Sequence, residues 1–198
     1  MSSKSLFAPL ADGFRIAYKE WGHGGPKKVL ALHGWMDNCN TFSHLGPFLA
    51  DNGYHVVAID QSSHGHSSHY PKNCMTSFPK YVLHARYMAD HLGWDKMIVL
   101  GHSMGAAVSS LFAGTFPEFV NKLVLIEMLG PVTFPEADAP ALMRKAFDAE
   151  MKFLAKPSSL PKIYNSLQDA AAARVATVSS YPGSQSLSME AALHLVRR

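Results

Sequence analysis

The stretch Val99-Leu100-Gly101-His102-Ser103-Met104-Gly105-Ala106-Ala107 limits what this chain can fold into more than any other part of its sequence. An aliphatic run over residues 96–100 predicts a buried strand, and small residues from Met104 onward predict a helix packed closely on a sheet. Glycine stands two positions before and two positions after Ser103, where a side chain would collide with a tight turn. This spacing is typical of a strained strand-to-helix turn that lifts a serine hydroxyl clear of the sheet.

The helix expected after this turn would direct its unpaired N–H groups and its positive dipole end at the same point. The backbone N–H of Met104 is therefore expected to lie where it can hold an oxyanion that develops beside Ser103. A structural Gly-Ser-Gly turn without chemistry is the alternative interpretation of the same residues.

Further apolar segments alternate with predicted helices along the chain. We expect strands over residues 14–21, 29–32, 55–59 and 123–126, and helices over residues 41–52 and 79–92. This alternation predicts an α/β fold with a mostly parallel sheet and helices on both faces. Ligands of such sheets bind beyond the carboxyl ends of the strands. Polar residues that follow predicted strands are His33, Asp60, Ser103 and Glu127.

The character of the sequence changes after Pro131, where strand-like runs stop. We expect helices over residues 141–156 and 160–178. Ser188 is expected to N-cap a last helix that ends near Arg197.

Composition excludes several classes of protein. The 198 residues are 47% hydrophobic and 17% charged, with a formal net charge of +3 and no Lys/Arg cluster that would favour nucleic acid. The two cysteines, Cys39 and Cys74, form neither a disulfide framework nor a metal site and fit a reducing compartment. No apolar run reaches membrane-spanning length, and no signal peptide or phosphate-binding loop is recognisable. We expect a cytoplasmic protein with no metal, no cofactor and no nucleic-acid partner.

Three segments occur in a fixed order along the chain: His33-Gly34-Trp35-Met36-Asp37-Asn38 after a strand, Asp60 with His64-Gly65-His66-Ser67-Ser68, and Gly101-His102-Ser103-Met104-Gly105. Their order and spacing resemble those of the α/β-hydrolase superfamily and, more narrowly, of the serine hydrolase-like proteins. The resemblance covers about residues 14–131. It implies an α/β-hydrolase core over residues 1–131 and a helical cap, or lid, over residues 132–198.

The resemblance also implies roles for individual residues. Ser103 would be the nucleophile, and the backbone N–H groups of Trp35 and Met104 would form the oxyanion hole. The remaining motif and pocket positions are His33, Gly34, Gly101, His102 and Gly105. The implied reaction is hydrolysis of an ester-like small molecule without a cofactor.

Members of this family return from the cap to two further strands, and the acid and the catalytic histidine usually follow these strands. None of the eleven histidines lies at the corresponding position, so we expect a core without its last strands and a partial cap. Glu127, after the last predicted strand, is a candidate acid, with a plain strand-end carboxylate as the alternative.

The other polar residues near the motifs have structural interpretations. We expect His33 to be structural rather than a base, and His64 and His66 to bond to local backbone. His102 is expected to pack on the pocket floor rather than to reach Ser103. Asp60 is expected to organise its loop.

Two functions from different classes remain open. The first is a serine hydrolase, and the second is an impaired pseudo-hydrolase or truncated isoform that binds a ligand or partner without turnover. Serine rather than aspartate at position 103 argues against dehalogenation or epoxide opening on the same fold. The open edge of the strand over residues 123–126 is expected to favour self-association. A peroxisomal location is the family alternative, although residues 196–198 form no peroxisomal tripeptide.

Overall fold

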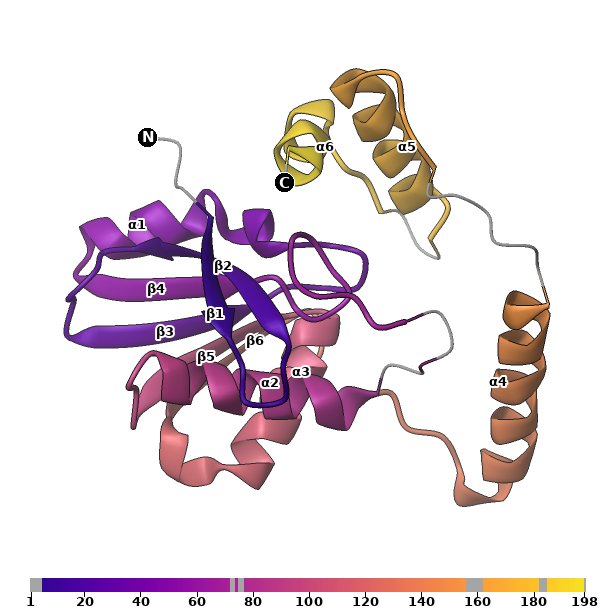
Figure 1. The fold of residues 1–198 in the computed structure, drawn as a ribbon, viewed down its shortest axis with the longest axis horizontal. Coiled ribbons are helices and arrows are strands. Elements are labelled where there is room, and N and C mark those ends of the chain that lie inside the picture. The colour runs from indigo at the N-terminus through magenta and orange to yellow at the C-terminus, as the bar shows by residue number, and fades with distance from the viewer. Residues whose placement is uncertain (1–4, 72–73, 75–76, 156–161, 182–184, 198) are drawn as a thin grey trace.

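The computed structural model describes residues 5–71, 74, 77–155, 162–181 and 185–197. A six-stranded sheet with the order β1-β2-β4-β3-β5-β6 lies at its centre (Figure 1). The strands are β1 (Leu6–Pro9), β2 (Arg15–Trp21), β3 (Lys27–Leu32), β4 (Tyr54–Ile59), β5 (Met97–His102) and β6 (Val120–Ile126). The last four strands are mutually parallel, whereas β1 and β2 run antiparallel to their neighbours. The mostly parallel α/β sheet expected from the sequence is therefore confirmed.

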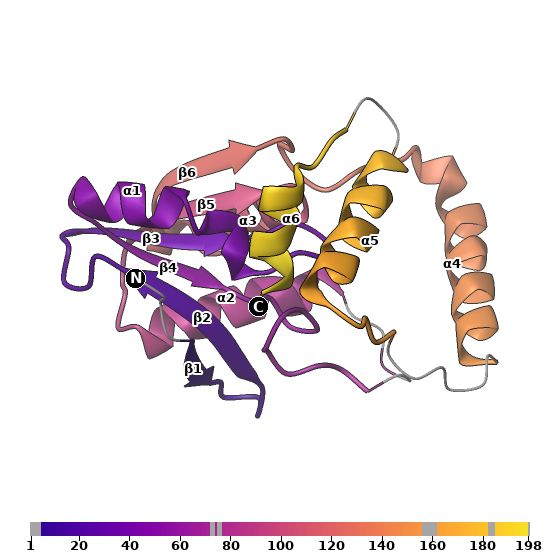
Figure 2. The ribbon, with the colours of Figure 1, turned by 90° about the horizontal axis from the view of Figure 1, so that it is seen from above.

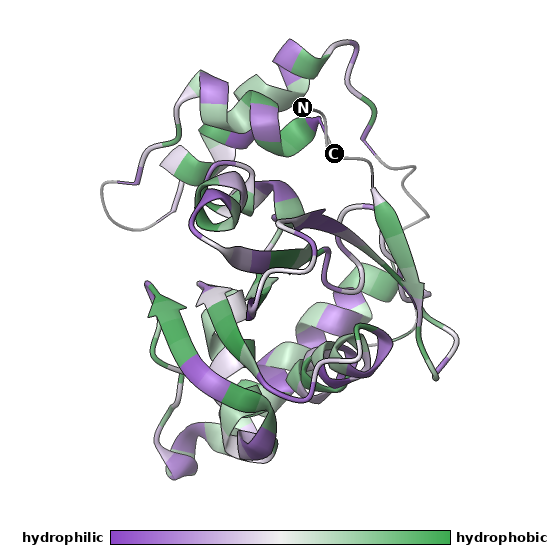
Figure 3. Ribbon diagram, turned by 90° about the vertical axis from the view of Figure 1, so that its left-hand side faces the viewer, coloured by the Kyte–Doolittle hydropathy of each residue, from purple (hydrophilic) through white to green (hydrophobic). Residues whose placement is uncertain are grey.

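Helices cover both faces of the sheet (Figure 2). On one face lie α2 (Phe78–His91) and α3 (Met104–Thr115), which pack against Leu30 and Leu32 of β3. On the other face lie η1 (Cys39–Phe42) and α1 (Leu45–Asp51), which pack against Val29 and Ala31 of the same strand. Successive residues of β3 thus enter two different cores, which is why the strand is a continuous apolar run. In Figure 3 the strands carry long green, hydrophobic stretches interrupted by purple, hydrophilic ones, and the helices show both colours.

Two N-terminal elements differ from the expectation. The strand β1 was not predicted, because its four residues end at Pro9 and show no clear alternation; proline is tolerated there because β1 is an edge strand. The single helix expected over residues 41–52 is wrong, since η1 and α1 are separate helices. The Asn38 side chain accepts from the N–H of Asn40 and starts η1, while Pro47 stands in the first turn of α1 and favours a new start there.

The chain after β6 is helical, with η3 (Glu136–Asp138), α4 (Ala139–Leu154), α5 (Leu167–Ser179) and α6 (Met189–Val196). The helix expected over residues 160–178 begins only at Leu167, and residues 160–161 and 156 lie outside the described residues. Ser188 caps α6 as predicted, with its hydroxyl accepting from the N–H of Ala191. In both ribbon views α4 stands apart from the sheet, whereas α5 and α6 lie together over its carboxyl end (Figures 1 and 2).

The sheet ends at β6, which pairs with β5 on one side and with no described strand on the other. Its residues Leu123, Val124 and Ile126 are 37%, 43% and 42% exposed, although the sequence has the pattern of a buried strand. Within the described residues, none of the helices combines the length and the apolar character needed to cross a bilayer.

Candidate active site

Ser103 lies between β5 and α3, at the carboxyl end of the sheet. Its backbone has φ 51° and ψ −120°, which L side chains rarely adopt. A Cβ atom on Gly101 would lie 2.5 Å from Cα of Ala106, and one on Gly105 would overlap the carbonyl oxygen of Leu32. Because these neighbours are backbone atoms, both positions need glycine. The strained strand-to-helix turn predicted from the sequence is confirmed.

The loop after β3 passes directly over this turn. A Cβ atom on Gly34 would lie 3.2 Å from both Cβ of Ser103 and Nδ1 of His102, so glycine allows the close approach. Trp35, the next residue, borders the same cavity as Ser103 and Met104, the first residue of α3. Among the described residues, the N–H groups of Trp35 and Met104 have no hydrogen-bond partner. Both N–H groups are therefore free to donate.

Two cavities meet at Ser103 and Trp35. The larger, about 600 Å³, extends toward α5 and α6, and His102 and Glu127 contribute to its wall. The second, about 560 Å³, has a mainly apolar lining of Phe78, Tyr81, Met104, Met128, Pro131 and Val132, besides Ser77. Both volumes are in the range that holds small organic ligands. Ser103 is thus accessible from a more polar and a more apolar side.

His33 is completely buried behind the serine. Its Nδ1 donates to the carbonyl of Gly34 at 2.7 Å, and its Nε2 accepts from the N–H of Gln61 at 3.0 Å. Burial, followed by the charge of His64, lowers the pKa of His33 to about 3. The ring is therefore neutral at physiological pH, and both of its nitrogens are bonded to main-chain groups, as a structural histidine requires.

His64 supports the loop that carries Trp35. Its Nδ1 donates to the carbonyl of Ser62 at 3.0 Å, and its Nε2 accepts from the N–H of Met36 at 3.2 Å. Met36 has φ 57°, so this hydrogen bond holds a strained residue next to Trp35. Burial lowers the pKa of His64, which keeps Nε2 free to accept. The bonding to local backbone that we expected is confirmed for His64.

Asp60 connects two loops at the end of β4. Its Oδ1 accepts from the N–H of Cys39 and its Oδ2 from the N–H of His66, both at 2.8 Å. Gly65 has φ 51°, and a Cβ atom there would overlap the carboxylate. Asp60 organises its loop as predicted, and the backbone of His66 is bound to it.

His102 and Glu127 form a pair in the wall of the larger cavity. Nε2 of His102 lies 3.3 Å from Oε2 of Glu127, and both side chains are partly exposed. As expected, His102 lines the pocket and is not bonded to Ser103, and its ring faces Glu127. Glu127 has φ 75°, a second strained position at a strand end. Within the described residues, no histidine ring is hydrogen-bonded to the hydroxyl of Ser103.

A buried ion pair joins this site to the helical region. Nη2 of Arg174, on α5, lies 3.2 Å from Oδ1 of Asp37, and both side chains are at least 85% buried. Burial raises the pKa of Asp37 despite the opposing effect of the Arg174 charge. The pair places α5 over the cavity that contains Ser103.

The comparison with known families agrees with this geometry. Residues 27–157 match the model of the alpha/beta hydrolase fold. The chain belongs to that family. A serine hydrolase-like protein of Dictyostelium discoideum is 38% identical over 122 residues, which cover 61% of this chain and 34% of that protein. A serine hydrolase-like protein of Danio rerio is 38% identical over 133 residues, which cover 67% of this chain and 40% of that protein.

A solved structure extends the likeness of this α/β-hydrolase chain to its whole length. A hypothetical protein of Pseudomonas aeruginosa superposes with a TM-score of 0.85 at 35% identity, and the match covers 100% of this chain and 65% of that protein. The matched segments of the two curated relatives amount to between a third and two fifths of their length.

The α/β-hydrolase fold brings most of the predicted site residues together. Around the turn lie Ser103, Trp35, Met104, Gly34, Gly101, Gly105, His102 and Glu127. The pair of Asp37 and Arg174 was not predicted, because the two residues are 137 positions apart in the sequence and no local pattern links them. A lone arginine in the alanine-rich run over residues 170–176 was the available signal.

Proposed function

We propose that this chain carries the nucleophile and the oxyanion hole of a serine hydrolase that acts on an ester-like small molecule. The observation that carries the proposal is the backbone of Ser103, strained at φ 51° immediately before the N-terminus of α3. Strain of this kind persists where the surrounding structure imposes it, and it is common at reactive residues. Ser103 would attack the carbonyl carbon, and the N–H groups of Trp35 and Met104 would hold the oxyanion.

The two cavities suggest how a substrate would lie. The acyl part would occupy the apolar cavity beside Phe78 and Val132, and the leaving group would face His102 and Glu127. In this proposal residues 1–131 form the core, and residues 132–198 form the cap that borders the leaving-group side. The likeness to relatives described as serine hydrolase-like supports a nucleophilic serine in this position.

One observation favours a second candidate function. A serine hydroxyl is a weak nucleophile until a base takes its proton. In the described part of the chain, His33 and His64 are bonded to backbone, and His102 faces Glu127 rather than Ser103. A protein that binds an ester-like ligand or a partner without turnover would need no such base.

A fluorophosphonate probe separates the two functions. We expect slow labelling at Ser103, abolished by Ser103→Ala and retained in the control Ser110→Ala, which changes a serine of α3 that lines neither cavity. Oxyanion donors and binding alone give roughly 10³–10⁴-fold acceleration over water, so hydrolysis of a short aryl ester should be slow but measurable. Binding of the aryl ester with no labelling above the Ser103→Ala level would support the second function instead.

We also propose a cytoplasmic location for this chain.

A further part of the proposal is self-association through β6. The unpaired edge of β6 presents exposed apolar residues and backbone groups with which another chain can pair. We expect concentration-dependent sedimentation at micromolar concentration, reduced by Val124→Lys, which places a charge on this edge. A cooperatively melting monomer at every concentration would contradict the self-association.

A further inference from the structure

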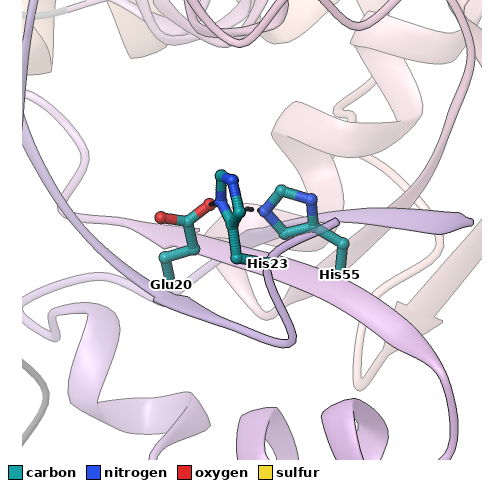
Figure 4. Close-up of side chains that lie close together, drawn as sticks. All are labelled: Glu20, His23 and His55. Atoms are coloured by element: carbon teal, nitrogen blue, oxygen red, sulfur yellow. Dashed lines mark hydrogen bonds and ion pairs between the residues drawn. The ribbon is translucent and has the colours of Figure 1, made fainter. Parts of the chain in front are cut away.

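The side chains of Glu20, His23 and His55 converge in space (Figure 4). They lie where β2 ends and β4 begins, whereas Ser103 follows the carboxyl end of β5. Oε1 of Glu20 lies 2.8 Å from Nδ1 of His23 and 2.5 Å from Nε2 of His55. The three potential ligand atoms all lie within 4.8 Å of one another. The proposed hydrolase chemistry uses none of these side chains.

The fold of the second and fourth strands builds this cluster. Glu20 on β2 is paired with Val57 on β4, so His55, two residues before Val57, is a diagonal neighbour on the same face of the sheet. His23 comes from the turn after β2, where the N–H of Gly25 donates to the carbonyl of Gly22 at 3.0 Å. The cluster therefore combines one strand pair and one tight turn.

Gly22 is what brings this turn close to β4. Its φ is 65°, and a Cβ atom there would overlap the carbonyl oxygen of Tyr54, the residue before His55. Only glycine permits both the backbone conformation and the approach. His23 is thus held next to His55, with their ring centroids 5.1 Å apart.

The surroundings fix two of the three side chains and leave the third free to adjust. The side chains of His55 and Glu20 are only 9% and 18% exposed, and the His55 ring packs edge-on against Trp94 at 5.0 Å. His23 is 84% exposed. The neighbouring Lys28 lies 3.7 Å from Asp95, so its ammonium group is drawn to a different carboxylate.

We propose that Glu20, His23 and His55 form a binding site for one Zn²⁺ ion, with a fourth position open to water. Two imidazoles and one carboxylate are ligands that Zn²⁺ prefers, and the exposed side of His23 leaves access for the ion. Tetrahedral Zn²⁺ separates its ligand atoms by about 3.3 Å, more than the 2.8 Å and 2.5 Å between Oε1 of Glu20 and the two histidine nitrogens. Binding therefore requires a small movement of the Glu20 carboxylate away from His55, and the exposed His23 side chain can adjust to it.

The bound ion would link the turn after β2 to the start of β4. We therefore expect it to raise the stability of the folded chain and to leave the reactivity of Ser103 unchanged. No metal site was expected from the sequence, because the three ligands are spread over residues 20–55 without a recognisable spacing. They meet only through the register of β2 and β4 and the approach of Gly22.

Calorimetric titration of the metal-free full chain with ZnCl₂ tests this proposal. We expect one ion per chain and an affinity at least about tenfold weaker in His23→Asn, since a ligand is then lost. Because His23 is exposed, we expect His23→Asn to fold normally. The matched control is His69→Asn, which changes another exposed histidine and should leave the affinity unchanged. Co²⁺ in place of Zn²⁺ should give the visible absorption bands of a four-coordinate site in the wild type and in His69→Asn only.

Thermal melting provides an independent measurement. Because Zn²⁺ would bind the folded chain, it should raise the melting temperature of the wild type and of His69→Asn, but much less that of His23→Asn. Absence of one-to-one binding, or equal affinity in His23→Asn and the wild type, would show that the three residues are a hydrogen-bonded cluster and no metal site. Labelling of Ser103 by the fluorophosphonate is unaffected by either result, so the two proposals fail separately.

Discussion

The sheet region over residues 5–126 and the helices α4, α5 and α6 are held together in different ways. In the sheet region, large side chains such as Phe112, Leu30 and Ile59 are 0–1% exposed, and apolar cores lie on both faces. In the three helices, the only buried residues among those described are Ala171 and Ala192. The first region is specified by burial, and the second has little apolar burial to specify its position.

The helix α4 shows this difference most clearly. Its apolar stripe of Met143, Phe147, Met151 and Leu154 predicts a helix, but these side chains are 48–58% exposed. The helical pattern therefore identified the element without identifying a partner for it. By contrast, α5 and α6 are tied to the sheet region by polar contacts, in which Asn38 and Asn40 donate to the carbonyls of Leu195 and His194.

The largest expected effect comes from the tightest packing in the sheet region. In Gly105→Ala the new methyl group would overlap the carbonyl oxygen of Leu32, and we expect a loss of about 3 kcal/mol in unfolding free energy. Gly114→Ala changes the same helix, α3, where nothing lies within 4 Å, and should instead stabilise by up to about 1 kcal/mol. Urea denaturation measures both. Equal effects of the two substitutions would mean that the close contact with β3 is not the reason why position 105 requires glycine.

The next effect is a pH dependence that belongs to the sheet region. The pKa of His33 is about 3 in the folded chain and ordinary when unfolded, so the unfolded state binds more protons between these values. Above pH 6.5 the buried His33 ring does not reduce the unfolding free energy. As the pH falls from 6.5 to 5, protonation of this histidine in the unfolded state lowers the unfolding free energy by about 2 kcal/mol. His64 and His84, whose pKa values are also lowered by burial, act in the same direction.

Unfolding curves of the wild type and His33→Asn at several pH values measure this contribution. The absolute stability of the variant is lower at every pH, but its dependence on pH should be flatter than that of the wild type. His69→Asn serves as an exposed-histidine control. If the curves stay parallel between pH 6.5 and 5, the His33 ring is not the proton-linked group.

The difference between the sheet region and the three helices also decides how much of the structure could be predicted from the sequence. The parallel strands, the turn at Ser103 and the polar strand ends were predictable, because a continuous apolar run marks each of these strands, including β6, whose apolar residues are partly exposed. The short edge strand β1 and the break between η1 and α1 were not, because they depend on pairing and capping rather than on periodicity. Contacts between distant polar residues, such as Asp37 with Arg174 and Glu20 with His55, leave no local pattern at all.

A smaller effect is expected at the contact between the two regions. Arg174→Leu removes the partner of Asp37, and we expect a local loss of about 1.5 kcal/mol in the docking of α5 and α6. Hydrogen exchange should become faster in these two helices and stay unchanged in β3 and β5. Arg144→Leu is the matched control, because it breaks an exposed pair with Asp148 within α4 and should change little. Faster exchange in β3 as well would show that both regions unfold as one unit.

The smallest effect should arise at the cap of α6. Ser188→Ala removes the hydroxyl that accepts from the N–H of Ala191 at 3.1 Å, and the loss of such a cap costs about 1 kcal/mol of helix stability. In Ser179→Ala, the control, the hydroxyl lost donates to the carbonyl of Val175 at the end of α5, and no cap is removed. We expect faster hydrogen exchange over α6 in Ser188→Ala only, with the exchange of the sheet unaltered. Because His194 and Leu195 accept from Asn40 and Asn38, fraying of α6 would also release these amides and open the cavity beside Ser103. Unchanged exchange in α6 would therefore mean that the two asparagine contacts, rather than the cap, hold this helix in place.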